Sequence, residues 1–353
     1  MDNFSRRGLL TGAGALLAAG AVGTSTAAAR PVRTLSLPAT KRFVMGGAGG
    51  EIFRSKPLQD VTVMQSFAFD TPNNRLFAGQ LRAGRPGNNG DLTLTQLRID
   101  DGARLGHMYL NGFGHAVSIG AEAVGSTTYL WTETDVDTAN GRGRQIARFP
   151  WQPDATLTSS SVTKWKPVAN GSVFTPAVDQ RYGRLGVRYA LSDGMHINVY
   201  SLAAARAGDF STVLASFKQP ALTSGVAFQG WALYGSYVYF WEGNPYPGSP
   251  NQDDATSKLW CYDINAGRLV DSFRTLAGWS LTYREAEGMA VYGSTDATAR
   301  LYFGFASGGT GDRRASFFYR DELVQPPSLL RDAVQAVAGV AQAGDDVALV
   351  VQV

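Results

Sequence analysis

Residues 229–242 read QGWALYGSYVYFWE, and this stretch indicates the fold class. Gln229 precedes an apolar run, a Gly-Ser pair interrupts the run at 235–236, and a second run rich in aromatic residues ends at Glu242. Aromatic and β-branched residues favour strands, and a two-residue turn that contains glycine between two such runs is typical of a β-hairpin. The stretch therefore predicts a hairpin with a polar residue at each end.

The same plan recurs in four other parts of the chain, and the five repeats begin at Gln65, His115, Thr175, Gln229 and Glu287. These starts are 50, 60, 54 and 58 residues apart, which leaves room for two more strands in each interval, such as 92–99 and 105–110 in the first. Four antiparallel strands in a repeat of about 40–50 residues are typical of a propeller blade. The repeats therefore predict an all-β, five-bladed β-propeller with four-stranded antiparallel blades; a β-sandwich is the alternative.

The two ends of the chain carry further predictions. Arg6 and Arg7 precede a short, mildly apolar run and three alanines at 27–29, so residues 1–29 are predicted to be a twin-arginine-type signal peptide. Residues 30–58 hold strand candidates outside the repeats, and one of these is expected to close the last blade. Residues 59–353 are predicted to form the propeller, followed by a short C-terminal helix at 328–343 and a strand at 347–353.

The predicted signal peptide implies where the protein acts. We expect export by the twin-arginine machinery and a secreted, extracellular protein without a transmembrane anchor, because no second apolar run of that length follows. A general secretory signal or a membrane anchor is the alternative for this segment.

Composition argues against several classes of function. The 353-residue chain has a formal net charge of +3 and lacks a basic stripe, so we expect no nucleic-acid partner. A single cysteine, Cys261, excludes an intramolecular disulfide and a cysteine-rich metal site. The sequence also contains no P-loop, dinucleotide fingerprint or nucleophile elbow.

The repeat plan places polar residues at equivalent positions of the blades. In a propeller, the starts of the innermost strands and the ends of the second strands usually meet at one face of the central channel. The five ends are Gln80, Glu133, Arg188, Glu242 and Phe305. A polar residue beside a buried strand costs stability unless its hydrogen bonds are satisfied. We therefore predict a polar, ligand-binding mouth; alternatively, these side chains only tie neighbouring blades together.

The candidate ligand-binding residues are Gln65, Gln80, His115, Glu133, Asp135, Arg188, Gln229, Glu242, Tyr246, Glu285 and Glu287. Arg188 is available to an anionic group, and Tyr246, in the proline-rich segment 244–257, to stack on a sugar. Four members of the set are also candidate catalytic residues, because histidine can exchange a proton near neutral pH and paired carboxylates can cleave glycosides: His115, Glu133, Glu242 and Glu287.

One segment has the spacing of a calcium loop. Glu133, Asp135 and Asp137 alternate before an Asn-Gly pair at 140–141, although the full EF-hand pattern is absent. Asp135 and Asp137 are therefore the candidate metal ligands, with Ca²⁺ as the metal, and we expect no other cofactor.

Four motifs resemble those of a known family: MQSFAFD at 64–70, MYLNGFGH at 108–115, YLWTE at 129–133 and EAEG at 285–288. They resemble the TagC-like β-propeller family, which includes a teichoic acid biosynthesis protein and the receptor-binding proteins of some staphylococcal phages. The resemblance spans roughly residues 60–320. It implies a five-bladed propeller that contacts cell-wall glycopolymers, and it brings no settled catalytic set.

We therefore expect an exported propeller that recognises a teichoic-acid-like polymer or polysaccharide at the mouth of its channel. The alternative is an exported glycoside hydrolase or polysaccharide lyase that acts on such a polymer at the same mouth. Sequence alone leaves open whether the protein is an enzyme and which sugar it contacts.

Overall fold

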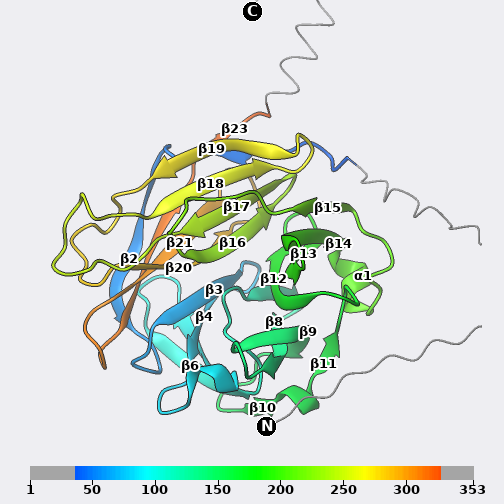
Figure 1. The fold of residues 1–353 in the computed structure, drawn as a ribbon, viewed down its shortest axis with the longest axis horizontal. Helices are drawn as coiled ribbons and strands as arrows, with labels where there is room; N and C mark the ends of the chain where they lie inside the picture. Colours follow the sequence, from blue (N-terminus) through cyan, green and yellow to red (C-terminus); the bar gives the residue numbers. More distant parts are fainter. Residues whose placement is uncertain (1–35, 327–353) are drawn as a thin grey trace, which may run out of the picture. The chain divides into compact units, whose positions relative to one another are not determined.

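The structure is a computed structural model that describes residues 36–326. These residues form five sheets of four antiparallel strands, one of which carries an additional parallel strand (Figure 1). The predicted all-β, five-bladed β-propeller is thus confirmed. The predicted signal peptide at 1–29, C-terminal helix at 328–343 and strand at 347–353 lie outside the described residues.

The blades follow one another along the chain, and each begins with its innermost strand. From the innermost strand outward, blade 1 contains β3 (Met64–Asp70), β4 (Arg75–Leu81), β5 (Leu92–Arg98) and β6 (Arg104–Asn111), with β10 (Thr156–Thr158) parallel to β6. Blade 2 contains β7 (Gly120–Val124), β8 (Thr127–Asp137), β9 (Arg142–Pro150) and β11 (Thr163–Trp165). Blade 3 contains β12 (Ser172–Asp179), β13 (Arg184–Leu191), β14 (Gly194–Ser201) and β15 (Ala215–Lys218).

The last two blades have the same order. Blade 4 contains β16 (Phe228–Tyr234), β17 (Tyr237–Glu242), β18 (Lys258–Asp263) and β19 (Arg268–Arg274). Blade 5 contains β20 (Glu285–Tyr292), β21 (Arg300–Ser307), β22 (Arg314–Arg320) and β2 (Gly49–Pro57). Outside the blades lie a two-stranded pair, a short α-helix and two 3-10 turns: β1 (Arg42–Phe43) with β23 (Leu323–Val324), α1 (Leu202–Arg206), η1 (Gly87–Asn89) and η2 (Ser159–Ser161). Within residues 36–326, no helix has the length and hydropathy needed to cross a membrane.

Blade 5 joins the two ends of the described chain. Its outermost strand, β2, precedes blade 1 in the sequence but pairs antiparallel with β22, from Gly49 opposite Arg320 to Pro57 opposite Arg314. In Figure 1 the blue strand β2 runs beside the orange strands of this blade. The segment expected to close the last blade lies within 30–58, and β2 occupies that place. Its backbone covers the edge of β22 that would otherwise be open.

The hydrophobic core is divided among the five interfaces between neighbouring blades. Each interface holds its own cluster of buried side chains, and the innermost strands contact one another in a cycle from β3 through β7, β12, β16 and β20 back to β3. Because blades cover each other on both faces, β3 is buried at every position and not only at alternate ones. Trp131, Trp231 and Trp241 are each fully buried in a different interface.

Loss of a ring from the closing strand should destabilise the whole propeller. Phe53 of β2 is 6% exposed and packs edge-to-face on Phe317 of β22, with 5.1 Å between ring centroids. Phe53→Ala is expected to lower the free energy of unfolding by about 3 kcal/mol, because a buried ring is removed. Urea unfolding followed by tryptophan fluorescence measures the change. The control, Phe273→Ala on β19, removes a ring that is 40% exposed and should cost about 1 kcal/mol or less. Equal losses would contradict a closing role for β2.

Candidate functional site

A cavity of about 660 Å³ opens at the face of the propeller where the innermost strands begin, which we call the mouth face. Its walls come from the starts of β3, β16 and β20, from the segment 61–63, and from the loops that follow β4 and β21. Five predicted ligand-binding residues line it: Gln65, His115, Gln229, Glu285 and Glu287. They belong to blades 1, 2, 4 and 5, so the ring brings together side chains that are far apart in the sequence. The volume is in the range of small-ligand sites.

Three of these side chains lie at equivalent β-bulges. The pairing register between the first two strands of a blade shifts at Gln65, at Gln229 and at Glu287. A bulge bends its strand and re-aims the side chain of the extra residue. Gly288 adopts a φ of +72°, and a Cβ at this position would lie 2.7 Å from Cα of Ser66 in the next blade. The bulges therefore allow a close approach of the innermost strands and direct three long polar side chains to one cavity.

Glu285 and Glu287 form a carboxyl pair within the cavity. Glu287 is 3% exposed; its burial and a hydrogen bond with Glu285 raise the pKa of Glu287 well above its ordinary value. Glu285 also accepts hydrogen bonds from the Tyr283 hydroxyl, at 2.6 Å, and from Nε2 of Gln229, at 3.3 Å. Two neighbouring carboxyls cannot both ionise cheaply, so the neutral form of Glu287 is favoured.

Within residues 36–326, the two cavity glutamines make only long hydrogen bonds with the protein. Nε2 of Gln65 lies 3.4 Å from the carbonyl oxygen of Val63, and Nε2 of Gln229 lies 3.4 Å from that of Gly243. Such distances exceed the usual range for N–H to O hydrogen bonds. Both amides can therefore exchange these partners for the hydroxyl groups of a ligand.

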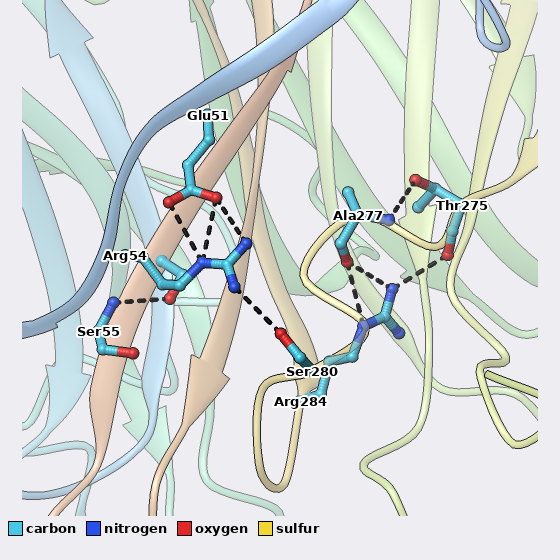
Figure 2. Close-up of polar contacts among 8 residues, drawn as sticks. Glu51, Arg54, Ser55, Thr275, Ala277, Ser280 and Arg284 are labelled. Carbon is cyan, nitrogen blue, oxygen red and sulfur yellow. Dashed lines mark hydrogen bonds and ion pairs between the residues drawn. The ribbon is translucent and has the colours of Figure 1, made fainter. Parts of the chain in front are cut away.

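The loop that leads into Glu285 is held from the inside by a buried arginine (Figure 2). Arg284 is fully buried, and its guanidinium donates to the carbonyl oxygens of Thr275 and Ala277 and to Oγ of Ser257. Burial lowers the pKa of Arg284 to about 10. These four hydrogen bonds fix the loop between β19 and β20 and, through it, the start of β20.

The same loop is held from the outside by the closing strand. Arg54 of β2 donates to Oγ of Ser280 at 3.1 Å while it pairs with Glu51 on its own strand (Figure 2). On the side of the cavity, the guanidinium of Arg313 stacks on the ring of Tyr283, 3.4 Å from its centroid. The cavity wall in blade 5 is therefore fixed by contacts to three separate segments of the chain.

His115 reaches the cavity from a position that differs from the sequence-based prediction. Strand β7 begins only at Gly120, so His115 lies in an irregular segment and not at a strand start. The backbone next to His115 is hydrogen-bonded by a side chain and not by a neighbouring strand: the amide of Ala116 donates to Oε1 of Glu133 at 2.9 Å. Burial and the positive charge of Arg142 lower the pKa of His115, while Glu133 opposes this shift, so the neutral imidazole is favoured.

Six predicted ligand-binding residues do not line the cavity: Gln80, Glu133, Asp135, Arg188, Glu242 and Tyr246. Gln80 is fully buried, and its Nε2 donates to the carbonyl oxygens of Asp60 and Thr62 at 2.9 and 2.7 Å. Glu242 is also fully buried and accepts a hydrogen bond from the amide of Thr223 at 3.1 Å. Both side chains thus tie the backbone of the segment that precedes their own blade to the second strand of that blade.

Tyr246 is 5% exposed, which places its ring inside the segment between β17 and β18. Its hydroxyl donates to the carbonyl oxygen of Trp279 at 3.2 Å, and its amide donates to that of Tyr283. The ring therefore does not offer the free face that stacking on a sugar requires. The indole of Trp279, by contrast, is 45% exposed on the adjoining loop.

The two candidate calcium ligands have protein partners. Asp135 accepts from Nζ of Lys164 at 2.7 Å and from Nε2 of Gln145, and Asp137 lies 3.1 Å from a guanidinium nitrogen of Arg144. Within residues 36–326 no group of three or more His, Cys, Asp or Glu side chains could hold a metal ion. Calcium binding at this loop stays a prediction.

Arg188 lies in blade 3, which contributes nothing to the cavity wall. The residue is 7% exposed; its Nε donates to Oε1 of Gln219 at 2.6 Å, and its guanidinium packs 3.9 Å from the ring centroid of Phe228. Burial and the positive charge of Arg142 lower the pKa of Arg188 to about 9, against the opposing effect of Glu133.

Sequence reasoning missed part of the cavity wall. The loops 81–87 and 310–313 line it, with Arg82 and Arg313 among their residues. A signal was available, because both loops directly follow second strands and must therefore emerge at the mouth face. Arg142 was also missed, and nothing in the repeat plan points to it.

The sequence model of a protein family, the phage five-bladed β-propeller receptor-binding platform domain, matches residues 63–319 of this chain. The "Putative major teichoic acid biosynthesis protein C" of Bacillus subtilis (strain 168) is 25% identical over 281 residues, which are 74% of this chain and 60% of that protein. The tail fiber of Staphylococcus aureus phage P68 superposes with a TM-score of 0.59 at 18% identity, over 85% of this chain and 56% of that one.

These matches confirm the resemblance expected from the motifs, and the tail fiber confirms the fold. The chain spans less than two thirds of the length of either relative.

Replacement of Glu287 should change how stability depends on pH. Its pKa is raised in the folded state, so its contribution to stability is complete below the ordinary value of 4.5 and is lost as pH rises toward the folded pKa. Glu287→Gln is neutral at every pH. Its melting temperature should match that of the wild type near pH 5 and exceed it increasingly toward pH 8. The difference in the free energy of unfolding should grow by up to about 1.4 kcal/mol per pH unit.

Circular dichroism melts at several pH values measure this difference. Glu242→Gln serves as the control, because it weakens the hydrogen bonds that Thr223 donates and should lower the melting temperature throughout the range. A constant difference between Glu287→Gln and the wild type would mean that the native carboxyl is ionised.

Proposed function

Because this chain belongs to the family of phage five-bladed β-propeller receptor-binding platform domains, we propose that it recognises a glycopolymer of the cell wall or extracellular space. We place the binding site at the mouth-face cavity. The single observation that supports this place is the set of equivalent bulges that direct Gln65, Gln229 and Glu287 into one cavity of about 660 Å³. The names of the two relatives, a teichoic acid biosynthesis protein and a phage tail fiber, are consistent with a cell-surface polymer as ligand.

The chemistry of the cavity suits a ligand rich in hydroxyl groups. Amides of Gln65 and Gln229 can both donate and accept, as sugar hydroxyls do, and the carboxyl pair adds oxygen acceptors. Arg82 and Arg313 lie in the wall as additional donors. Because these groups are already held on fixed strands, little conformational entropy is lost when the ligand binds.

Cleavage of the same polymer is the second candidate function. The feature that favours it is the raised pKa of Glu287, since a glycosidase needs one protonated carboxyl. Glycosidases, however, keep their two carboxyls roughly 5–9.5 Å apart with the scissile bond between them. Glu285 and Glu287 lie two residues apart on one strand and interact closely enough to raise the pKa of Glu287, so we favour binding over hydrolysis.

The proposal is tested with a panel of purified teichoic acids and neutral polysaccharides. The double variant Gln65→Ala with Gln229→Ala should weaken binding of the preferred polymer by about tenfold or more, because two hydrogen-bonding amides are lost. Isothermal titration calorimetry measures affinity, and chromatography of the same mixtures measures released fragments. Gln152→Ala, at an exposed position that does not line the cavity, is the control. Unchanged affinity of the double variant would refute this site, and fragment release would favour the enzyme.

Export is proposed from the N-terminal segment alone. Arg6→Lys combined with Arg7→Lys should retain the precursor in the cell, because the twin-arginine machinery reads the arginine pair. Immunoblots of cell and medium fractions measure the distribution. The control, Arg30→Lys with Arg33→Lys, changes two arginines beyond the predicted cleavage site and should be secreted normally. Normal secretion of the first variant would rule out this route.

A further inference from the structure

Glu287 differs from the other buried carboxyl side chains of the described chain. It is 3% exposed and lines the cavity, yet no amide, hydroxyl or guanidinium group of residues 36–326 donates a hydrogen bond to it. The five other buried carboxyls each accept hydrogen bonds from backbone or side-chain donors: Asp70, Glu122, Glu133, Asp179 and Glu242. A buried carboxyl without a donor is costly, so this exception points to a partner that the protein itself does not supply.

The second carboxyl of the pair faces the same cavity. Glu285 and Glu287 lie two residues apart on β20, and both line the cavity wall. Glu285 accepts only from neutral groups, the hydroxyl of Tyr283 and the amide of Gln229, which orient its carboxyl without compensating its charge. The cavity therefore holds two carboxyls, and no cationic side chain of the described residues pairs with either.

The cationic side chains of the cavity wall are engaged elsewhere. Arg82 packs on an aromatic ring of β6, Arg85 lies 4.0 Å from the carboxylate of Asp91, and Arg313 donates to a carbonyl oxygen of its own loop. His115 is favoured in its neutral form, because burial and a nearby arginine lower its pKa. The charge of the carboxyl pair is thus left for a ligand to compensate.

We propose that the carboxyl pair binds a primary ammonium group carried by the ligand, so that the recognised glycan contains an unsubstituted amine. An ammonium group has three N–H donors and one positive charge, which suit two carboxyls and the amide oxygen of Gln65 or Gln229 in the same wall. A calcium ion fits less well, because it takes about 6–8 oxygen ligands and no group of three or more His, Cys, Asp or Glu side chains within residues 36–326 could hold a metal ion. The inference rests on the proposed function and adds one specific group to the hydroxyl-rich ligand.

Binding of an ammonium group should be linked to pH. Burial and the neighbouring Glu285 raise the pKa of Glu287, so the neutral carboxyl is favoured in the free protein. An ionised carboxyl attracts a cation more strongly, and binding therefore releases a proton from the pair. Affinity should increase with pH, by up to about tenfold per pH unit while Glu287 is neutral in the free protein.

The first test uses small probes and the full chain. Ethanolamine is compared with ethylene glycol, which has no charge, and with choline, which has the charge but no N–H donor. At about 100 mM and constant ionic strength, ethanolamine should raise the melting temperature near pH 7.5 by about 2 °C or more, because it binds only the folded state. Ethylene glycol and choline should leave it unchanged.

The variants assign the effect to the carboxyl pair. The ethanolamine shift should be lost in Glu287→Gln and reduced in Glu285→Gln, whereas Glu242→Gln, at a buried carboxyl outside the cavity wall, should keep it. No shift in the wild type, an equal shift with choline, or the full shift in Glu287→Gln would overturn the proposal. A shift with calcium chloride in place of ethanolamine would indicate a metal site and would also overturn it.

Polymer binding separates this proposal from the cavity itself. Selective N-acetylation of the preferred polymer removes its ammonium charge and keeps its hydroxyl groups, and it should weaken binding to the wild type by about tenfold or more. Affinity for the unmodified polymer should rise between about pH 5.5 and 7.5 in the wild type but not in Glu287→Gln. Equal affinity before and after acetylation, together with loss in the double glutamine variant, would refute the ammonium site and leave the cavity in place. Full affinity in every variant would refute both.

Discussion

Every blade of this propeller has two apolar faces, and only a closed ring covers both. The five hydrophobic clusters of residues 36–326 lie between blades, so each blade depends on its two neighbours for the burial that stabilises it. The innermost strands β3, β7, β12, β16 and β20 contact one another in a complete cycle, and β2, the outermost strand of blade 5, adds Phe53 to the cluster between blades 5 and 1. The energetic requirement for closure therefore links the two ends of the described chain.

Closure also assembles the candidate site. Gln65 and Glu287 are separated by more than two hundred residues, yet they line the same cavity because blade 5 adjoins blade 1. The contact is close: Gly288 leaves no space for a side chain beside Ser66. The same bulges therefore have two effects. They let the innermost strands approach closely at the axis, and they direct polar side chains into the cavity at the mouth face.

The architecture could be predicted from the sequence because its signal is repeated five times, and the predicted strand 92–99 corresponds to β5 (Leu92–Arg98). The polar residues at strand starts led to the prediction that Gln65, Gln229 and Glu287 share one site, and all three line the cavity. His115 was assigned to a strand start, since periodicity cannot show that the Glu133 side chain replaces strand pairing there. The carboxyl contact of Glu285 with Glu287 and the burial of Tyr246 depend on separations of a few ångströms, which residue order does not encode.

The pairing of β2 with β22 has a consequence for biosynthesis. Pro57 leaves the ribosome 257 residues before its partner Arg314, so the closing strand stays unpaired until blades 1 to 4 and the first two strands of blade 5 have been made. Blades 1 to 4 can form in order as they emerge, but the ring has no stable complete form until blade 5 is made. Pairing over so long a separation is also slow, because the ends of a long loop must find each other. Closure of the ring is therefore a late step in folding, and until β22 is available β2 is a free strand that other chains can pair with.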